Sequence, residues 1–500
     1  MTLRNSAALG AMAIGLAASP ALADLTAEQV WSSWKSLAES AGQTITGTET
    51  RAGNRLNVSD ITMTMDAAQD DTVTARLGDV AFEERGDGTV AVDMPETYPI
   101  AVMTTSDAGE TVEMDITVTQ SGMSVIAKGD AENTAYDVDG PEVTVALESL
   151  TVDGKPVDMS ARAVLRQLVG NYAVSQGAPR RVDSEFRVES ASIDVSGMSP
   201  EDGSTVTIKG AASNLVSTSV STLPEGIDTS DLGKMLEAGF SSKGSLGYVD
   251  MSYAMNANDS GDVVNVSTTS DSGSLDFTLA DGGMVYDVRN SGTEVVLKGS
   301  QIPFPQVDLS FEDSAFRFQL PLVQTEAPAD FGLLTRISGL KVSNDIWAMF
   351  DPAGQLPRDP ATLVLDLSGK GRWLTDITNP EAMQSEETPG ELEALNVKQL
   401  QLSLAGAELT GQGDFTFDNT KAATLGAAPM PAGTMSLKLV GGNALLDKLV
   451  GMGLIPQEQA TGFRMMLGLF ARPGEGADTL VSDISVTEDG QVLANGQRLR

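Results

Sequence analysis

The strongest constraint on this chain is a two-residue alternation of apolar and polar side chains, which returns along most of its length. In residues 111–119, Val112, Met114, Ile116 and Val118 alternate with Thr, Glu and Asp. Equivalent runs lie at residues 61–65, 143–147, 249–255, 275–279, 307–311, 316–320, 363–367, 400–404 and 435–439. Successive side chains of a β-strand point to opposite faces. The pattern therefore predicts an antiparallel sheet with one packed face and one wet face.

Asp-Gly pairs separate many of these runs. They occur at residues 87–88, 153–154, 202–203, 281–282 and 489–490. Both residue types tolerate the positive φ that tight turns require. These pairs therefore mark the turns between predicted strands.

Helical patterns are fewer and punctuate the sheet. Residues 26–41 open on a capping-box pattern, Thr26 with Gln29, and continue with a stripe of Val30, Trp34, Ala38 and Ala41. A second helix is predicted over residues 160–175, where the apolar residues at helical spacing are Ala161, Val164, Leu165, Leu168, Val169 and Tyr172.

The remaining predicted helices are shorter. One spans residues 230–238 and stops at Gly239, and one or two lie within residues 330–350, interrupted near Gly339. Near the end, Asn443 is expected to cap a helix through Val450. Pro456 opens a last helix, which ends at Pro473 and carries Ala460, Phe463, Leu467 and Phe470.

The predicted fold class is mainly β with a few helices (α+β). It is a long curved antiparallel sheet capped by short helices, and a trough is one form that such a sheet can take. Two soft boundaries divide it: the Pro-rich residues 321–328 and the acidic residues 379–393, which we interpret as an exposed loop. We predict a strand-rich part at 24–325 and a mixed strand and helix part at 326–500, either separate from the first or continuous with it.

Residues 1–23 have the pattern of an export signal. Arg4 precedes an apolar run of 12 residues, Ala7 to Ala18, and small residues flank Leu22. A membrane-spanning helix needs about 20 apolar residues. We therefore predict a signal peptide cleaved before Asp24, a periplasmic location, and no transmembrane span in the mature chain.

Composition excludes several kinds of chemistry. The chain has no His and no Cys, so a Ser-His-Asp triad, a thiolate nucleophile and a His/Cys zinc site are all ruled out. It carries 69 acidic against 32 basic residues, a net charge of −37. Nucleic-acid affinity comes largely from Lys and Arg on phosphates, so we expect no nucleic-acid partner.

Carboxylate pairs are the first candidates for His-free catalysis. Asp70-Asp71, Glu83-Glu84 and Glu386-Glu387 are adjacent. Neighbours in a strand point to opposite faces, so the first two pairs do not converge, and we interpret all three as solvated surface. Ser-x-x-Lys occurs as Ser32 with Lys35 and as Ser338 with Lys341, but the S-D-N and K-T-G elements of a penicillin-binding site are missing.

Calcium is the metal that an acidic, oxygen-rich chain suits best. Residues 256–261 mimic the first half of an EF-hand loop, but Ser267 stands where the bidentate Glu belongs. Asp137 and Asp139 flank a predicted turn at Gly140 and offer only two carboxylates. We predict no catalytic, cofactor-binding or metal-ligating residue, no cofactor and no enzymatic activity.

Methionines offer a different hint. Met63, Met65, Met114, Met251, Met255 and Met435 lie on apolar strand faces. Their flexible thioethers suit either an adaptable trough for acyl chains or ordinary core filling. Residues 466–470, Met-Leu-Gly-Leu-Phe, suit contact with a membrane or a buried helix equally well.

The C-terminal motifs resemble a known family. They are residues 346–352 (Ile-Trp-Ala-Met-Phe-Asp-Pro), 356–361 (Leu-Pro-Arg-Asp-Pro-Ala), 433–446, and the closing Asp489-Gly490 and Ala494-Asn495-Gly496-Gln497. Together with the export signal, they are similar to domain of unknown function 2125, an uncharacterised envelope family of Gram-negative bacteria. The likeness is best over residues 330–500. The family implies no catalytic residues, and the strand pattern also resembles trough-shaped envelope proteins that handle lipids.

Two functions follow as hypotheses. The first is a non-catalytic periplasmic envelope protein that binds a lipid-like or other hydrophobic ligand in a β-sheet trough. The alternative is a structural or assembly module of the envelope that contacts a protein partner through strand edges. A carboxylate-dependent hydrolase comes last.

Overall fold

The computed structural model describes residues 24–40, 42–66, 72–105, 111–199, 202–225, 232–379, 382, 389–422 and 429–499. The predicted export signal lies outside the described residues, as do Asp70-Asp71, Glu386-Glu387 and most of the predicted acidic loop. Within the described part, no helix is long and apolar enough to cross a membrane.

The described residues form one antiparallel sheet of 26 strands, which confirms the predicted fold class. The first strands are β1 (Gln43–Ala52), β2 (Arg55–Asp66), β3 (Thr72–Leu77), β4 (Val80–Glu84), β5 (Val90–Asp93), β6 (Thr97–Thr105), β7 (Thr111–Ser121) and β8 (Ser124–Gly129). The middle strands are β9 (Asn133–Val152), β10 (Lys155–Pro156), β11 (Asp158–Ser175), β12 (Arg180–Met198), β13 (Thr205–Leu223), β14 (Ser241–Asp259), β15 (Asp262–Ala280), β16 (Gly283–Gly299), β17 (Val307–Pro321), β18 (Ala329–Val342) and β19 (Ala361–Trp373). The last are β20 (Gly390–Leu404), β21 (Ala407–Ala422), β22 (Pro429–Val440), β23 (Arg472–Pro473), β24 (Thr479–Val486), β25 (Val492–Ala494) and β26 (Gln497–Arg498).

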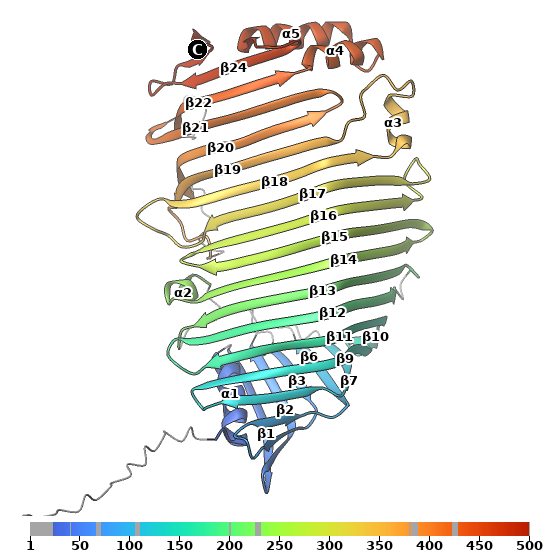
Figure 1. Cartoon of the computed structure of the whole chain (residues 1–500), viewed down its shortest axis with the longest axis vertical. Helices are drawn as coiled ribbons and strands as arrows, with labels where there is room; N and C mark the ends of the chain where they lie inside the picture. The colour runs from blue at the N-terminus through green and yellow to red at the C-terminus, as the bar shows by residue number, and fades with distance from the viewer. Residues whose placement is uncertain are drawn as a thin grey trace, which may run out of the picture.

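The sheet is a meander in which each long strand pairs with the next one along the chain, from β9 and β11 through to β22 and β24 (Figure 1). Strands β17 and β18 pair across the Pro-rich connection. Near the N-terminus, β3 and β4 are two halves of one bent strand, because β2 pairs with both. The predicted Asp-Gly turns are confirmed. In two of them both residues have positive φ, 50° and 70° at Asp153 and Gly154, and 53° and 70° at Asp281 and Gly282.

Five helices lie among the described residues: α1 (Ala27–Ser40), α2 (Leu232–Glu237), α3 (Asn344–Phe350), α4 (Gly442–Gly451) and α5 (Gln457–Phe470). Figure 1 places α1 at the N-terminal end of the ladder of strands and α4 and α5 at the opposite end. The capping box of α1 is confirmed, since the Gln29 amide donates to Thr26 Oγ1 (3.2 Å) and the Thr26 amide donates to Gln29 Oε1 (2.9 Å).

The long strands change the phase of their alternation at one place. In β11 the half-buried residues before this place are Ala161, Ala163 and Leu165, and those after it are Leu168, Gly170 and Tyr172. Gln167 stands between the two sets with a φ of 52°. The register with β9 and β12 does not shift here, so no extra residue is inserted. The positive φ of Gln167 reverses the alternation instead, so that the apolar residues on both sides of it lie on the same face.

The phase change crosses the sheet from strand to strand. The residues at this place are Pro141, Gln167, Glu189 and Asn214 from β9 to β13, and Asp250, Asp271, Gly292, Glu312 and Gly339 from β14 to β18. The register shifts between the two sets, where β13 pairs with β14. We call them the phase-change line. Five of them, Gln167, Asn214, Asp250, Gly292 and Gly339, have positive φ, for which Gly, Asn and Asp are the usual residues. A Cβ at Gly292 would lie 2.0 Å from the Asp271 carboxylate, so a larger residue there would force the Asp271 side chain to move.

The phase change explains the predicted helix that is wrong. Residues 158–175 form strand β11, not a helix. Two alternating runs of opposite phase place Ala161, Leu165, Leu168 and Tyr172 at steps of four, three and four, which reproduces helical spacing. The same error occurs at residues 330–342, which form β18 with Gly339 at its phase change; only α3 is helical there.

A third correction concerns the cap of α4. Asn443 is not the cap, because Gly441 occupies that position with a φ of 73°. The Asp478 carboxylate accepts hydrogen bonds from the backbone amides of Ala444 (2.8 Å) and Asn443 (3.3 Å). Burial alone raises the pKa of Asp478, but these bonds and the Asn443 side chain outweigh it and lower the pKa.

Buried apolar residues of the described part form two core clusters. The larger core packs α1 on the first strands, with Trp31 1% and Phe82 0% exposed and their ring centroids 6.0 Å apart. A smaller core lies around Trp347, Leu356 and Ala405. Most of the middle of the sheet is half-buried, as expected of a single layer.

Replacement of Phe82 by Ala should lower the free energy of unfolding by about 3–5 kcal/mol, because it opens a cavity between α1 and the sheet. Phe316→Ala is the control. That ring is 43% exposed in the middle of the sheet and should cost no more than about 2 kcal/mol. Urea unfolding followed by circular dichroism measures both, and equal losses would contradict the closed core at α1.

Asp478→Ala should destabilise the protein by about 1 kcal/mol at pH 7, because it removes the α4 cap. The pKa of this carboxyl is lowered in the folded state, so its stabilisation is complete above the ordinary value near 4. It is lost as the pH falls through the lowered pKa. Thermal unfolding should therefore show a smaller difference between variant and wild type at pH 3 than at pH 7; an equal difference would contradict the assignment.

Candidate functional site

Apolar side chains of neighbouring strands stand directly opposite one another in rows. The first row runs through Leu77, Ile100, Ile116, Leu147, Ala161, Val195, Ile208, Met255, Val266, Leu297 and Val307. All of its members are apolar, from β3 to β17. Side chains paired across antiparallel strands lie on one face, so this row is a continuous apolar band.

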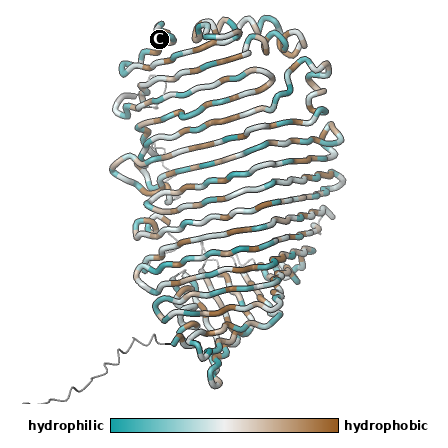
Figure 2. Tube along the Cα trace, in the orientation of Figure 1, coloured by the Kyte–Doolittle hydropathy of each residue, from teal (hydrophilic) through white to brown (hydrophobic). Residues whose placement is uncertain are grey.

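A second row lies on the other side of the phase-change line. It runs through Tyr136, Tyr172, Ser184, Ser219, Gly244, Phe277, Tyr286, Phe318, Leu333, Leu367, Val397, Gly413, Met435 and Ile484. We call the surface that carries both rows the apolar face. Figure 2 shows the corresponding alternation of apolar and polar residues along the strands. Of the methionines named from the sequence, Met255 lies in the first row and Met435 in the second. Met63 lines the pocket described next.

The apolar face ends in a pocket beneath α1. This cavity of about 620 Å³ lies between α1, the first strands and the start of the second row. Its lining is Ser33, Trp34, Leu37, Ala38, Gln43, Ile45, Met63, Met94, Met123, Val125, Tyr136, Val138, Tyr172, Val174 and Phe186. We call it the α1 pocket.

The few polar groups at the α1 pocket are uncharged. The Tyr136 hydroxyl is buried without a hydrogen bond, and Ser33 accepts one from Gln176 (2.8 Å). Burial raises the pKa of Tyr172 to about 12, helped by Tyr136 and opposed by Arg180. Both phenols therefore stay neutral at physiological pH, and the lining suits an apolar guest.

The opposite end of the apolar face has a pocket of its own. This cavity of about 470 Å³ lies between β20–β22 and helices α4 and α5. Its lining is Leu402, Leu404, Ala407, Leu409, Leu439, Gly442, Leu445, Leu446, Leu449, Phe463, Met466, Leu467 and Phe470. The sheet residues among them continue the apolar face, since Leu363, Leu402, Leu409 and Leu439 pair in succession. We call it the α4–α5 pocket.

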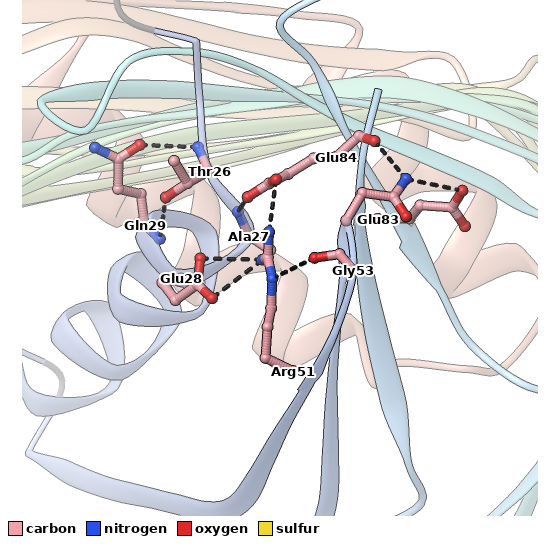
Figure 3. A network of polar contacts seen from close by, with 9 residues as sticks. Thr26, Ala27, Glu28, Gln29, Arg51, Gly53, Glu83 and Glu84 are labelled. Atoms are coloured by element: carbon pink, nitrogen blue, oxygen red, sulfur yellow. Dashed lines mark hydrogen bonds and ion pairs between the residues drawn. The ribbon is translucent and has the colours of Figure 1, made fainter. Parts of the chain in front are cut away.

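The carboxylate pair Glu83 and Glu84 is structural. Figure 3 shows Glu84 at the start of α1, where it accepts bonds from the Ala27 amide (3.0 Å) and Arg51 (2.7 Å). The Arg51 bond lowers the pKa of Glu84, and the same bond raises the pKa of Arg51. Glu83 pairs instead with Arg55 (2.9 Å). The two carboxylates do not converge, as the strand alternation predicted.

The other sequence candidates also have structural roles. Lys35 pairs with Glu49 (3.0 Å), and Ser338 and Lys341 lie in a strand, so the predicted helix-face geometry is missing. Of the calcium-like residues 256–261, residues 256–259 lie in β14, and only Ser260 and Gly261 form the turn to β15. The turn predicted around Gly140 is wrong, because residues 137–140 lie inside β9. Among the described residues no group of three or more acidic side chains is placed to hold a metal ion.

Two features of the site were missed at the level of sequence. The phase-change line is visible in the printed sequence as a switch of apolar residues from odd to even positions with no turn between them. In β17, Val307 and Leu309 precede the switch, and Phe316 and Phe318 follow it. The α1 pocket had no such signal, because its lining comes from segments far apart in the chain.

One comparison with known proteins gives a match. Residues 272–499, from β15 to β26, match the family model described as uncharacterized protein conserved in bacteria (DUF2125). No curated protein and no solved structure matches the chain significantly. The matched range includes all the residues that line the α4–α5 pocket and none of those that line the α1 pocket. Residues 272–499 are thus a DUF2125 region, and the resemblance drawn from the C-terminal motifs is confirmed over this range.

Proposed function

We propose that this protein is a non-catalytic envelope protein of the periplasm that binds a lipid-like ligand along the apolar face. One observation carries the proposal: two rows of side chains opposite one another run along the sheet, and an apolar pocket lies at each end. The export pattern of residues 1–23 supports the periplasmic location.

The apolar face is too exposed for an ordinary packed core. Ile193 is 46%, Phe316 43% and Leu402 45% exposed, and all three lie on this face. Contiguous apolar surface of this kind marks a ligand, membrane or protein contact. An acyl chain gains about 0.8 kcal/mol for each methylene that it buries, so a long narrow apolar band suits a long aliphatic chain.

A strand edge supports the alternative, an assembly module that acts through a protein partner. Strand β1 pairs only with β2 in the described part of the chain, which leaves its other edge open to an added strand. Crosslinking in cells separates the two functions. A reproducible protein partner on β1 without bound lipid would favour the module.

Purified protein should contain bound acyl species when it is examined by native mass spectrometry or by lipid extraction. After delipidation it should take up lipid again. Protein that is isolated without any acyl species and takes up none would contradict the proposed function.

Phe277→Glu should weaken lipid binding at least tenfold, about 1.4 kcal/mol or more, because it places a charge in the second row. Thr278→Glu is the matched control, since the adjacent side chain points to the other face, where its partner is Lys243. Lipid content per protein measures both. Equal lipid content in the two variants would contradict a ligand site on the apolar face.

A further inference from the structure

One buried hydroxyl group in the α1 pocket lacks a partner. Tyr136 lines this pocket and is 5% exposed, and its hydroxyl oxygen has no hydrogen-bond partner among the described residues. Burial raises the pKa of Tyr136, so the group keeps its proton at neutral pH. A buried polar group without a hydrogen bond destabilises a folded protein. Such a group in the lining of a cavity therefore points to a partner that occupies the cavity.

Two further donors lie beside the Tyr136 hydroxyl without reaching hydrogen-bond geometry. They are the Ser33 hydroxyl and the Trp34 indole N–H, which both oppose the rise in the Tyr136 pKa that burial causes. Both residues line the pocket. Gln176 donates to Ser33 Oγ (2.8 Å), which leaves the Ser33 proton to be donated elsewhere. No described group accepts that proton or the Trp34 Nε1 proton, so three donors lie together in the lining without an acceptor.

The rest of the lining suits a flexible hydrocarbon chain. It is mostly apolar and includes Met63, Met94 and Met123, whose unbranched thioethers adapt to the shape of a guest. The volume of about 620 Å³ lies within the range of small-molecule sites, about 300–1,000 Å³. A guest that fits both parts of the pocket therefore has an aliphatic chain and one group that accepts hydrogen bonds.

Charge favours an uncharged acceptor over an anion. No Lys or Arg belongs to the lining of the α1 pocket. Arg180 is the cation whose charge acts on Tyr172, but its guanidinium donates to Ser36 Oγ of α1 (2.6 Å). Two acids, Glu39 and Glu225, act on Arg180 in turn, so the surroundings have no net positive charge. A carboxylate buried without a cation is costly, whereas an ester carbonyl accepts the same hydrogen bonds without a charge.

We propose that the α1 pocket binds an uncharged acyl ester, with the carbonyl oxygen of the ester next to Tyr136, Ser33 and Trp34. The hydrocarbon chain of the ester then lies among the methionines of the pocket. This inference rests on the proposed function and narrows the ligand class from a lipid-like compound to one with an uncharged carbonyl group. A fatty acid is ionised at neutral pH and fits less well, and a plain hydrocarbon offers nothing to the three donors.

Titration of the purified, delipidated protein with methyl laurate, laurate and dodecane tests the proposal. Tryptophan fluorescence reports binding, because Trp34 lines the pocket. At neutral pH the wild type should bind methyl laurate more tightly than laurate. Tyr136→Phe should lower the affinity for methyl laurate about three- to tenfold, because one hydrogen bond to the carbonyl is lost. The affinity for dodecane should stay the same, since dodecane accepts no hydrogen bond.

Two controls separate recognition of the ester from a structural role of the hydroxyl. Tyr172→Phe changes another ring of the same lining, whose hydroxyl is not among the buried groups without a partner, and should leave the affinity for methyl laurate unchanged. Without ligand, Tyr136→Phe should unfold at the same temperature as the wild type or at a higher one. The substitution removes a buried group that makes no hydrogen bond within the protein.

Several outcomes would overturn ester recognition. If the wild type and Tyr136→Phe bind methyl laurate equally, or if laurate binds as tightly as methyl laurate, the donors do not select an uncharged carbonyl. Bound dodecane would still support the proposed function in that case. A ligand-free Tyr136→Phe variant that unfolds well below the wild type would reveal a partner of the hydroxyl inside the protein. Protein that binds none of the three compounds would contradict the proposed function as well.

Discussion

The register between neighbouring strands is the constraint on which the rest of this structure depends. Because side chains alternate with a period of two, a slip of one residue would turn an apolar set toward water. The phase-change line lets each long strand switch between odd and even positions while its apolar side chains stay on one face. Asn214, Asp250 and Gly292 supply the positive φ that the switch needs. The line keeps both rows on one surface from β9 to β18.

A sheet built in this way has little to cover it. Helix α1 closes a core around Trp31 at one end of the sheet, and α4 with α5 closes a pocket at the other, while α2 and α3 lie beside the strands between them. Between them the apolar face stays half-exposed, which is costly in water. The same feature that leaves the sheet thin in its middle exposes the long apolar surface on which we propose that a guest binds.

Sequence alone predicted much of this fold, for identifiable reasons. The alternating runs and the Asp-Gly turns are local signals, and all of them lie at strands and turns of the structure. The capping box of α1 was equally local. The errors arose where a local pattern fits two kinds of secondary structure. Residues 158–175 have the spacing of a helix because the alternation of the strand changes phase at Gln167. The Asp478 cap and the α1 pocket join segments far apart in the chain, and no local pattern in the sequence predicts such contacts.

Photo-crosslinking in cells from the two faces of a single strand tests most directly whether the apolar face holds a ligand. A photoreactive residue at Phe318 lies in the second row, and one at Gln319 lies on the opposite face of β17. Lipid adducts are expected from position 318 and few or none from position 319. Equal lipid adducts from both positions, or protein adducts alone from 318, would contradict a ligand held along the apolar face.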